Sequence, residues 1–424
     1  MRDMDNMKFY RLPASVFLTG LVLFSIAGCQ MQKKQVAKVR PEINDDLVEF
    51  LLRTEPEKFK KIYRVPEQYR AQVLLSVIEK DDTGGFKIDR YGYRLGAEYF
   101  YPASTIKLGA SVAALQYLQD LDLPEGVVVD AYTPMEIYPL FEDESHQFTD
   151  TSNVEQGVMT VGHEIRRTLL VSSNSAFNHL FEIVGQQEIN EMMMEAGLDE
   201  TKYIHRLSEI RSAEENRMLP QIGFHVDGGE VIELPVRKSS LVLSNQGLDG
   251  IEIGRRYMQG GEVVEGPMNF EMKNRASLRD LQDVMLKVVL PDVELGSPAF
   301  RLKESDRDLL LKALSEHPLD SKNPVYTKED LGDWIGDTRF LPGLLRVDSA
   351  RENWMIYEKS GTAYGFSLDN TVVMHKPSGK IFALAAVLYT NENETLNDDH
   401  YEYDFADAVM ADLGELLGRY VMKD

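Results

Sequence analysis

The sequence predicts an α+β fold, in which one antiparallel sheet is built from both ends of the chain and a helical lobe lies between. Runs of β-forming residues occur early, at 72–78 and 86–93, and late, at 354–359, 371–375 and 381–389. Helical patterns fill much of the chain between these two groups. We expect a cleft where the sheet and the helical lobe meet.

The composition is that of an ordinary globular protein with an acidic surface. Of 424 residues, 43% are hydrophobic and 9% aromatic, which is enough apolar content for a large core. The formal net charge is −23. Such a surface repels nucleic-acid phosphates, so no nucleic-acid partner is expected. The acidic residues are spread along the chain, as expected when negative charge serves solubility.

The N-terminal segment has the layout of a bacterial lipoprotein signal peptide. Residues 14–27 are almost all apolar or small, a run too short for a comfortable membrane span. The run ends in Ile26-Ala27-Gly28-Cys29, which resembles a lipobox, where the cysteine is lipidated and becomes the mature N-terminus. We therefore predict a signal peptide over 1–28 and a membrane anchor on Cys29. A plain signal peptide with an incidental cysteine is the alternative.

Two further features bear on the anchor. Cys29 is the single cysteine of the chain, so it cannot form an intramolecular disulfide. Gln30 follows it, and the sorting rules of double-membraned bacteria then favour the outer membrane. The protein is expected on the periplasmic side of the cell envelope. Residues 29–44 are mostly polar and basic and are expected to form a tether.

The folded domain is expected to span 45–424 and to begin with a helical pattern. Residues 104–119 are apolar on nearly all sides, which predicts a helix buried in the core. Further helical patterns run from 161 to 197. From 221 to about 268, short β-rich runs are broken by Gly, Asp and Asn, which predicts an inserted set of hairpins.

The remaining elements follow from the same patterns. Helices are expected at 277–289 and 305–314, and a long terminal helix at 403–420. Pro377-Ser378-Gly379-Lys380 is a good hairpin turn between the last two strands. No internal repeat and no long low-complexity tract is present.

Three short motifs stand in order along the chain. They are Ser104-Thr105-Ile106-Lys107, Ser172-Ser173-Asn174 and Lys359-Ser360-Gly361. The second is weak alone, because Ser-x-Asn also occurs at Ser321-Lys322-Asn323. Their order and their structural settings give the set its weight.

The first motif has the chemistry of an activated serine. Ser104 and Lys107 are three residues apart, so they share a helix face. At the helix start, backbone N–H groups favour a developing oxyanion. A serine hydroxyl needs a base, and a lysine can be that base when burial and nearby positive charge lower its pKa. Lys359 could supply the charge. The alternatives are a helix cap for Ser104 and a solvated side chain for Lys107.

The other two motifs supply candidate substrate contacts. Ser172 could relay a proton from Lys107 to a leaving nitrogen, and Asn174 could bind a substrate amide or hold Lys107; ordinary turn capping is the alternative. Lys359 and Ser360 could bind a substrate carboxylate.

The end of the third motif would complete the site. Gly361 would let a substrate backbone approach closely. The Thr362 N–H would join that of Ser104 in an oxyanion hole. A solvated strand end is the alternative reading of this motif.

The motifs match S-x-x-K, S-x-N and K-[S/T]-G, the set of penicillin-binding proteins and class A β-lactamases. The stretch YFYPASTIKLGASVAALQYL resembles the nucleophile helix of the class A enzymes, and YEKSGTAYGF resembles their closing strands. The resemblance implies a β-lactamase/transpeptidase-like fold and acyl-enzyme chemistry on β-lactams or acyl-D-alanyl peptides. It implies no cofactor, and a small-molecule or peptidoglycan-like substrate.

Two departures from the family pattern matter. The second and third motifs are farther apart than usual, and the β-rich insertion accounts for the excess. Class A enzymes also carry a Glu, within E-x-x-L-N, that activates the deacylating water. Here the corresponding stretch, TKYIHRLSEIRSAEENRMLP, has no such motif, and Glu209 is a weak candidate for the base, with Glu214 and Glu215 nearby. Efficient β-lactam hydrolysis is therefore in doubt, whereas acylation is not.

Other enzyme classes lack their motifs. The chain has no G-x-S-x-G elbow, no H-E-x-x-H site and no P-loop, and its scattered histidines suggest no metal site. The leading hypothesis is a β-lactamase-like serine hydrolase. A D,D-peptidase or a narrow esterase or amidase on the same scaffold is an alternative, and so is a non-turnover sensor or scaffold protein. The sequence does not indicate an oligomeric state.

Overall fold

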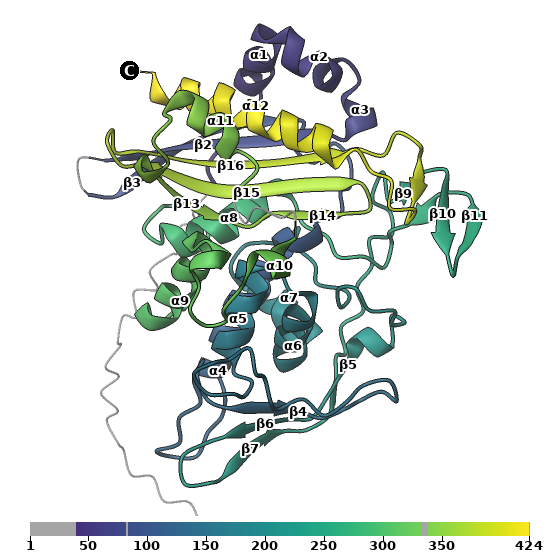
Figure 1. The fold of residues 1–424 in the computed structure, drawn as a ribbon, viewed down its shortest axis with the longest axis vertical. Coiled ribbons are helices and arrows are strands. Elements are labelled where there is room, and N and C mark those ends of the chain that lie inside the picture. Colours follow the sequence, from purple (N-terminus) through teal and green to yellow (C-terminus); the bar gives the residue numbers. More distant parts are fainter. Residues whose placement is uncertain (1–39, 82–83, 333–337, 424) are drawn as a thin grey trace, which may run out of the picture. The chain divides into compact units, whose positions relative to one another are not determined.

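One mixed sheet organises the fold, and its strands come from both ends of the chain, as expected (Figure 1). The computed structural model describes residues 40–81, 84–332 and 338–423, which belong to one compact unit, residues 39–424. The predicted signal peptide, Cys29 and most of the predicted tether lie outside the described residues. In sheet order the strands are β1 (Ile43–Asn44), β3 (Phe86–Tyr93), β2 (Gln72–Lys80), β16 (Lys380–Tyr389), β15 (Phe366–His375) and β13 (Trp354–Glu358), and β14 (Gly361–Ala363) also pairs with β15.

The register of the sheet follows from alternating side chains that are buried on both faces. In β16, Phe382 and Leu384 belong to one hydrophobic cluster, whereas Ala383 and Val387 belong to the other. A strand covered on both sides reads as a continuous apolar run, which is how this segment appears in the sequence. All strand pairs of the sheet are antiparallel except β1 with β3, which is parallel.

The late strands differ in length from the sequence expectation. The hairpin of β15 and β16 pairs from Phe366↔Tyr389 to His375↔Lys380, so its first strand is five residues longer than expected. The expected strand at 354–359 ends at Glu358, and a short second strand, β14, begins at Gly361. Lys359 and Ser360 therefore lie in the break between two strands that both pair with β15.

Helices cover both faces of the sheet (Figure 1). One face carries the helices from the two chain ends, and the other carries the helical lobe. The first group is α1 (Asp46–Thr54), α2 (Pro56–Arg64), α11 (Leu341–Val347) and α12 (Tyr403–Met422). The second group is α4 (Lys107–Gln119), α5 (Val161–Leu170), α6 (Asn174–Val184), α7 (Gln186–Glu195), α8 (Leu278–Val289) and α9 (Glu304–Ser315). The short elements are α3 (Pro66–Tyr69), α10 (Lys328–Leu331) and the 3₁₀ turns η1 (Ala103–Ile106), η2 (Glu215–Arg217), η3 (Pro318–Asp320) and η4 (Arg351–Asn353).

The helix predicted to be buried on all sides is α4. Its residues are buried from Lys107 to Gln116 without interruption, so it has no solvent-facing stripe. Gly109 makes this close packing feasible, because a side chain there would overlap the hydroxyl of Tyr203. The functional residues at the start of α4 consequently sit on a rigid element in the core.

The region 221–268 forms hairpins, as expected, although its status as an insertion stays a prediction. The hairpins are β6 with β7 and β10 with β11, and β9 pairs with β12. The small strands are β4 (Met135–Ile137), β5 (Met218–Leu219), β6 (Ile222–His225), β7 (Val231–Leu234), β8 (Arg237–Lys238), β9 (Glu252–Ile253), β10 (Arg256–Gln259), β11 (Glu262–Glu265), β12 (Met268–Asn269) and β17 (Thr395–Leu396). The sequence did not indicate that β10 pairs in parallel with β17, which ties the hairpin region to the C-terminal part of the chain.

The last residues of the predicted tether are part of the fold. β1 pairs with β3, and Arg40 forms ion pairs of 2.8 and 3.0 Å with Asp280 and Asp283 of α8. Asp283 also pairs with the buried Arg90 of β3 at 2.7 Å. The chain therefore contacts α8 from Arg40 and joins the sheet at Ile43, a few residues before the expected start of the domain at Asp45.

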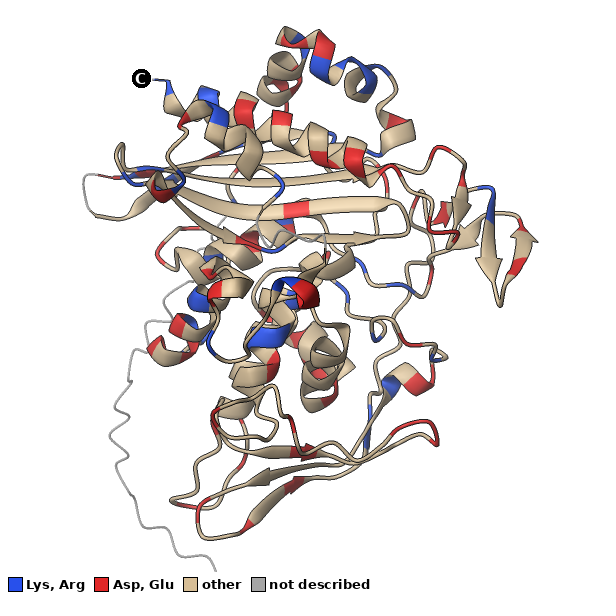
Figure 2. Ribbon diagram, in the orientation of Figure 1, with Lys and Arg blue, Asp and Glu red and all other residues tan. Residues whose placement is uncertain are grey.

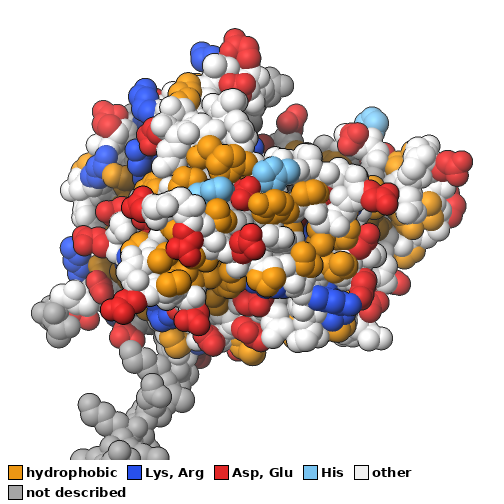
Figure 3. All heavy atoms as spheres, turned by 90° about the horizontal axis from the view of Figure 1, so that it is seen from below, with side chains coloured by type: hydrophobic (Ala, Val, Ile, Leu, Met, Phe, Trp, Pro, Cys, Tyr) orange, Lys and Arg blue, Asp and Glu red, His pale blue; other side chains and the backbone are white. Residues whose placement is uncertain are grey.

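The surface agrees with the spread of charge seen in the sequence. Acidic residues lie on elements of both the sheet and the helical lobe (Figure 2). On the face in Figure 3, acidic side chains are interspersed among hydrophobic ones and do not form one patch. Within the described ranges, no helix is both long and apolar enough to cross a membrane.

A glycine contact between α11 and α12 gives a test of the packing on the sheet. In Gly414→Ala, the new Cβ would overlap the backbone carbonyl oxygen of Phe340, which cannot move as a side chain can. We expect a loss of about 2 kcal/mol in the free energy of unfolding, measured by urea denaturation. Gly418→Ala on the same helix is the control, because its Cβ would meet a methyl of Leu344 at 3.0 Å. Equal stability of the two variants would contradict the close approach.

Candidate active site

Ser104 lies in a tight turn at the start of the central buried helix. It is the second residue of η1, which runs directly into α4. Ala103 before it has a φ of 47°, a left-handed conformation that costs a non-glycine residue about 1 kcal/mol or more. Thr105 closes the turn, because its hydroxyl and its backbone N–H donate to the carbonyl of Pro102 at 2.5 and 3.1 Å. The two hydrogen bonds of Thr105 thus hold Ser104 at the helix start, although Ala103 before it is strained.

Lys107 is one turn along the helix and is fully buried. Its amine donates to the carbonyl oxygen of Ser172, to the hydroxyl of Ser172 at 3.2 Å and to the side-chain oxygen of Asn174 at 2.7 Å. The first two motifs are therefore in direct contact. Within the described chain, no carboxylate forms an ion pair with Lys107, and its hydrogen bonds do not include the hydroxyl of Ser104.

The second motif occupies the turn between α5 and α6. Ser172 has a φ of 57°, which turns the chain sharply after α5. Ser173 caps α6, accepting a hydrogen bond from the backbone N–H of Ala176 at 3.2 Å. Asn174, the first residue of α6, accepts from Lys107 and donates to the hydroxyl of Ser208 at 2.7 Å. The capping role thus falls to the middle serine, which leaves Ser172 and Asn174 facing the amine.

The third motif is beside the nucleophile turn. Lys359 is buried, and its amine donates to the carbonyl of Ser360 at 3.0 Å. At Gly361, a side chain would overlap the backbone nitrogen of Ser104, so only glycine allows β14 to pass this close. Ser360 and Gly361, together with Thr362, line a cavity that Ser104 also lines.

Electrostatics make Lys107 a candidate base. Burial, and secondarily the positive charge of Lys359, lower the pKa of Lys107 well below its ordinary value. Burial also lowers the pKa of Lys359. A buried amine without a carboxylate partner favours its neutral form, which can accept a proton.

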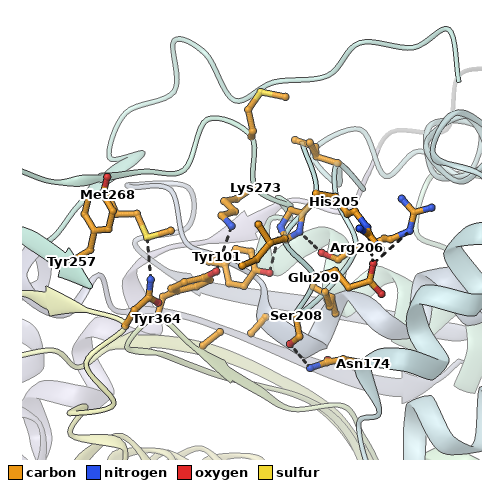
Figure 4. Close-up of a pocket in the computed structure, with 18 of the residues that line it drawn as sticks. Tyr101, Asn174, His205, Arg206, Ser208, Glu209, Tyr257, Met268, Lys273 and Tyr364 are labelled. Atoms are coloured by element: carbon orange, nitrogen blue, oxygen red, sulfur yellow. Dashed lines mark hydrogen bonds and ion pairs between the residues drawn. The ribbon is translucent and has the colours of Figure 1, made fainter. Parts of the chain in front are cut away.

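Ser104 and Thr362 stand at the junction of two cavities. The smaller one, about 260 Å³, contains Ser172 and Ser360, and Arg339 forms part of its wall. The larger one, about 870 Å³, contains Asn174 and extends along Tyr364 and the hairpin region (Figure 4). A substrate whose reacting bond lies at Ser104 could therefore place one part in each cavity.

Glu209, the weak candidate for a deacylation base, lines the larger cavity but contacts other groups. It accepts a hydrogen bond from the side-chain amide of Asn178 at 2.7 Å and lies 3.6 Å from the guanidinium of Arg211. Its role stays a prediction. Ser208 occupies the position next to it and contacts Asn174 (Figure 4).

Sequence reasoning missed several residues at these cavities. Arg339 donates its backbone N–H to the buried Asp369 at 2.6 Å and pairs with Asp407 at 2.7 Å. Tyr364 and Lys273 line the larger cavity. Only Tyr364 had a signal, its position three residues after the third motif. The described residues contain no cluster of His, Cys, Asp and Glu suited to a metal ion.

Comparisons with known proteins agree with the motifs. Residues 61–223 match the model of the β-lactamase enzyme family, a segment that contains the first two motifs. A search of curated proteins gave no match.

Solved structures align over most of the chain at low identity. A class A β-lactamase from Clostridium kluyveri DSM 555 is 15% identical, with a TM-score of 0.46, and the alignment covers 87% of this chain and 99% of that one. A β-lactamase from Desulfarculus baarsii DSM 2075 is 15% identical, with a TM-score of 0.44 and coverage of 88% and 99%. The structure of PBP-A is 14% identical, with a TM-score of 0.46 and coverage of 90% and 98%.

The family match includes the nucleophile turn, its buried lysine and the turn that holds that lysine. The third motif follows in the same order on the strand beside Ser104. Residues 61–223 thus resemble the β-lactamase enzyme family, and the third motif lies outside the matched segment.

Proposed function

We propose that the protein is a serine hydrolase that works through an acyl-Ser104 intermediate on β-lactams or on related amides and esters. The observation that carries the proposal is the environment of Lys107. Its amine is fully buried, is held by Ser172 and Asn174, and has a pKa lowered by burial and by Lys359. A neutral amine one helical turn from a serine hydroxyl is the arrangement needed to activate that hydroxyl.

The acylation step assigns a role to each motif. The Lys107 amine takes the hydroxyl proton as Ser104 Oγ attacks the carbonyl carbon, and the carbonyl oxygen becomes negatively charged. The backbone N–H groups of Ser104 and Thr362 would stabilise that charge. When the C–N or C–O bond breaks, the proton passes from Lys107 through Ser172 to the leaving atom. The closeness of Gly361 to Ser104 supports this use of the strand.

The smaller cavity suits the leaving part of the substrate. Ser172, the proposed proton relay, lies there beside Ser360 and Arg339. The guanidinium of Arg339 lines this cavity, as does the carboxylate of Asp330, and Lys359 directly precedes Ser360 in the chain. A carboxylate next to the broken bond, as in β-lactams and acyl-D-alanyl peptides, would be attracted here.

The rate at which the acyl-enzyme is hydrolysed would distinguish the alternative functions. Glu209 is the candidate carboxylate in the stretch where class A enzymes carry the deacylating Glu. Its side chain contacts Asn178 and Arg211. This favours slow release of a β-lactam acyl group, hence a D,D-peptidase or a narrow esterase over an efficient β-lactamase. A non-turnover sensor would show a stoichiometric adduct, and a scaffold protein would show none.

The proposal retains the lipid anchor on Cys29, which lies outside the described residues. Anchored on the periplasmic side of the envelope, the site would meet peptidoglycan-like peptides as well as β-lactams.

The first test is covalent labelling. A fluorescent penicillin should label the full chain at Ser104, adding the mass of one intact penicillin, because ring opening by Oγ loses no atoms. Ser104→Ala should abolish the label, and Ser175→Ala, on the exposed side of α6, should keep it. Peptide mapping by mass spectrometry locates the adduct. Wild-type protein that is unreactive toward every β-lactam and ester probe would refute the proposal.

The pH dependence of acylation tests the role of Lys107. The neutral amine is the reactive form, so the rate should rise with pH by about tenfold per unit and level off below the ordinary pKa of lysine. In Lys359→Ala the loss of positive charge should raise the pKa of Lys107 and move this rise to higher pH, whereas Lys359→Arg should move it less. Stopped-flow acylation with a chromogenic cephalosporin measures the profile. A pH profile of acylation that is the same in Lys359→Ala as in the wild type would contradict an effect of Lys359 on the pKa of Lys107.

Removal of the Glu209 carboxylate tests deacylation. Because its contacts are with Asn178 and Arg211, we expect Glu209→Gln to change the decay rate of the acyl-enzyme by less than about threefold. Intact-mass spectra recorded over hours give this rate. A decrease of about a hundredfold or more would instead assign Glu209 as the base.

A further inference from the structure

The larger cavity has an apolar and aromatic wall beside the nucleophile. Tyr101, Tyr257 and Tyr364 line it together with Met258 and Met268. Tyr101 and Tyr364 meet edge to face, with ring centroids 5.2 Å apart. Such a wall suits a flat or apolar group.

Most of the charged groups in this wall are already paired. Arg206 forms an ion pair with Glu182 at 2.8 Å. Arg211 pairs with Asp143 and Glu144 at 2.9 and 3.0 Å. The two carboxylates of the wall are Glu209, which Asn178 and Arg211 engage, and Asp399, which is exposed at the edge.

Lys273 differs from these groups. In the described part of the chain its amine has no carboxylate partner, although the protein carries a net charge of −23. The amine donates to the hydroxyl of Tyr364 at 3.4 Å, a long hydrogen bond, and lies 5.4 Å from the centre of that ring. The side chain is half-buried and points toward Tyr101 and Tyr364 (Figure 4).

The neighbour His205 does not compete for an anion. Burial, and secondarily the charge of Lys273, lower the pKa of His205 to about 3, so the imidazole is neutral at neutral pH. Its ring stacks on Tyr101 at a centroid distance of 6.0 Å. Lys273 is thus the cation that an anionic group in this cavity would meet.

We propose that the larger cavity binds the acyl part of the substrate, and that Lys273 selects acyl groups in which an aromatic or apolar body carries an anion. The assignment of the acyl part to the larger cavity and of the leaving group to the smaller one rests on the proposed function. The relay Ser172 lies in the smaller cavity, with the leaving group, whereas Asn174, a candidate for binding the substrate amide, lies in the larger one. Tyr364 follows β14 directly, so the recognised group lies close to the strand beside Ser104.

Two matched penicillins test the proposal. One carries a (4-carboxyphenyl)acetyl side chain, and the other carries the uncharged (4-carbamoylphenyl)acetyl side chain of nearly the same shape. We measure the second-order acylation rate of the full chain with each by intact-mass spectrometry. The wild type should prefer the carboxylate by about tenfold, as expected for one charge-assisted hydrogen bond in a partly dry site.

Variants of Lys273 then locate the source of the preference. Lys273→Gln should bring the ratio of the two rates to about one, Lys273→Arg should retain most of it, and Lys273→Glu should reverse it. The matched control is Lys87→Gln, which removes an equal charge at an exposed site on β3 and should keep the ratio. Equal rates in the wild type, or a preference that survives in Lys273→Gln, would overturn the proposal.

The same comparison can be made without catalysis. Calorimetric binding of the two penicillins to Ser104→Ala should show the same preference and the same loss in Ser104→Ala/Lys273→Gln. If no β-lactam or ester probe acylates Ser104, the proposed function fails, but this binding ratio still decides the role of Lys273. Acylation with no dependence on Lys273 would leave the proposed function standing and remove the subsite.

Discussion

The candidate site depends on one buried lysine amine, that of Lys107, which has no carboxylate ion pair among the residues that the structure describes. An ammonium group without a carboxylate is costly to bury, and a lysine in such a place is stable mainly as the neutral amine. Lys107 is surrounded by oxygen atoms of Ser172 and Asn174, which accept its hydrogen bonds without contributing a full negative charge. The fold thus satisfies the amine as a hydrogen-bond donor and still disfavours its protonation.

The rest of the architecture supports this arrangement. α4 is buried along its length, which fixes the amine in depth and direction. The turn between α5 and α6 brings oxygen atoms of Ser172 and Asn174, which accept hydrogen bonds from the amine, from a different part of the chain. The sheet, whose strands come from both chain ends, brings Lys359 beside the same turn, so a second cation acts on the first. Chemistry at Ser104 consequently requires the whole domain to be folded.

Patterns within one segment predicted much of the fold and of the site. The apolar run of α4, the strands at both ends and the turn at Pro377-Ser378-Gly379-Lys380 are local signals; each element formed, with Lys380 already in β16. The three motifs could be placed because each has its own helix start, turn or strand end. The break between β13 and β14 at Lys359 and Ser360 was not predicted. The pattern of this one segment does not show that Gly361 lies against Ser104 in space.

Contacts between distant segments explain what the sequence did not reveal. Lys273 looks like any surface lysine in the sequence, because its neighbours Tyr364 and His205 come from other segments of the chain. Arg40 read as part of a basic tether because its partners, Asp280 and Asp283, are on α8. β10 and β17 are far apart in the sequence, and the hydrophobic pattern within each segment does not show that the two strands pair.

That pairing has a consequence for how such a protein can change. One wall of the larger cavity comes from the hairpin region and from the residues around β17, whereas the three motifs belong to the start of α4, the α5–α6 turn and the break between β13 and β14. Substitutions in the wall can alter which molecules fit the cavity while the residues around Ser104 keep their geometry. The cavity wall and the residues around Ser104 therefore come from different segments, so that relatives can differ in the wall and keep the same residues around Ser104.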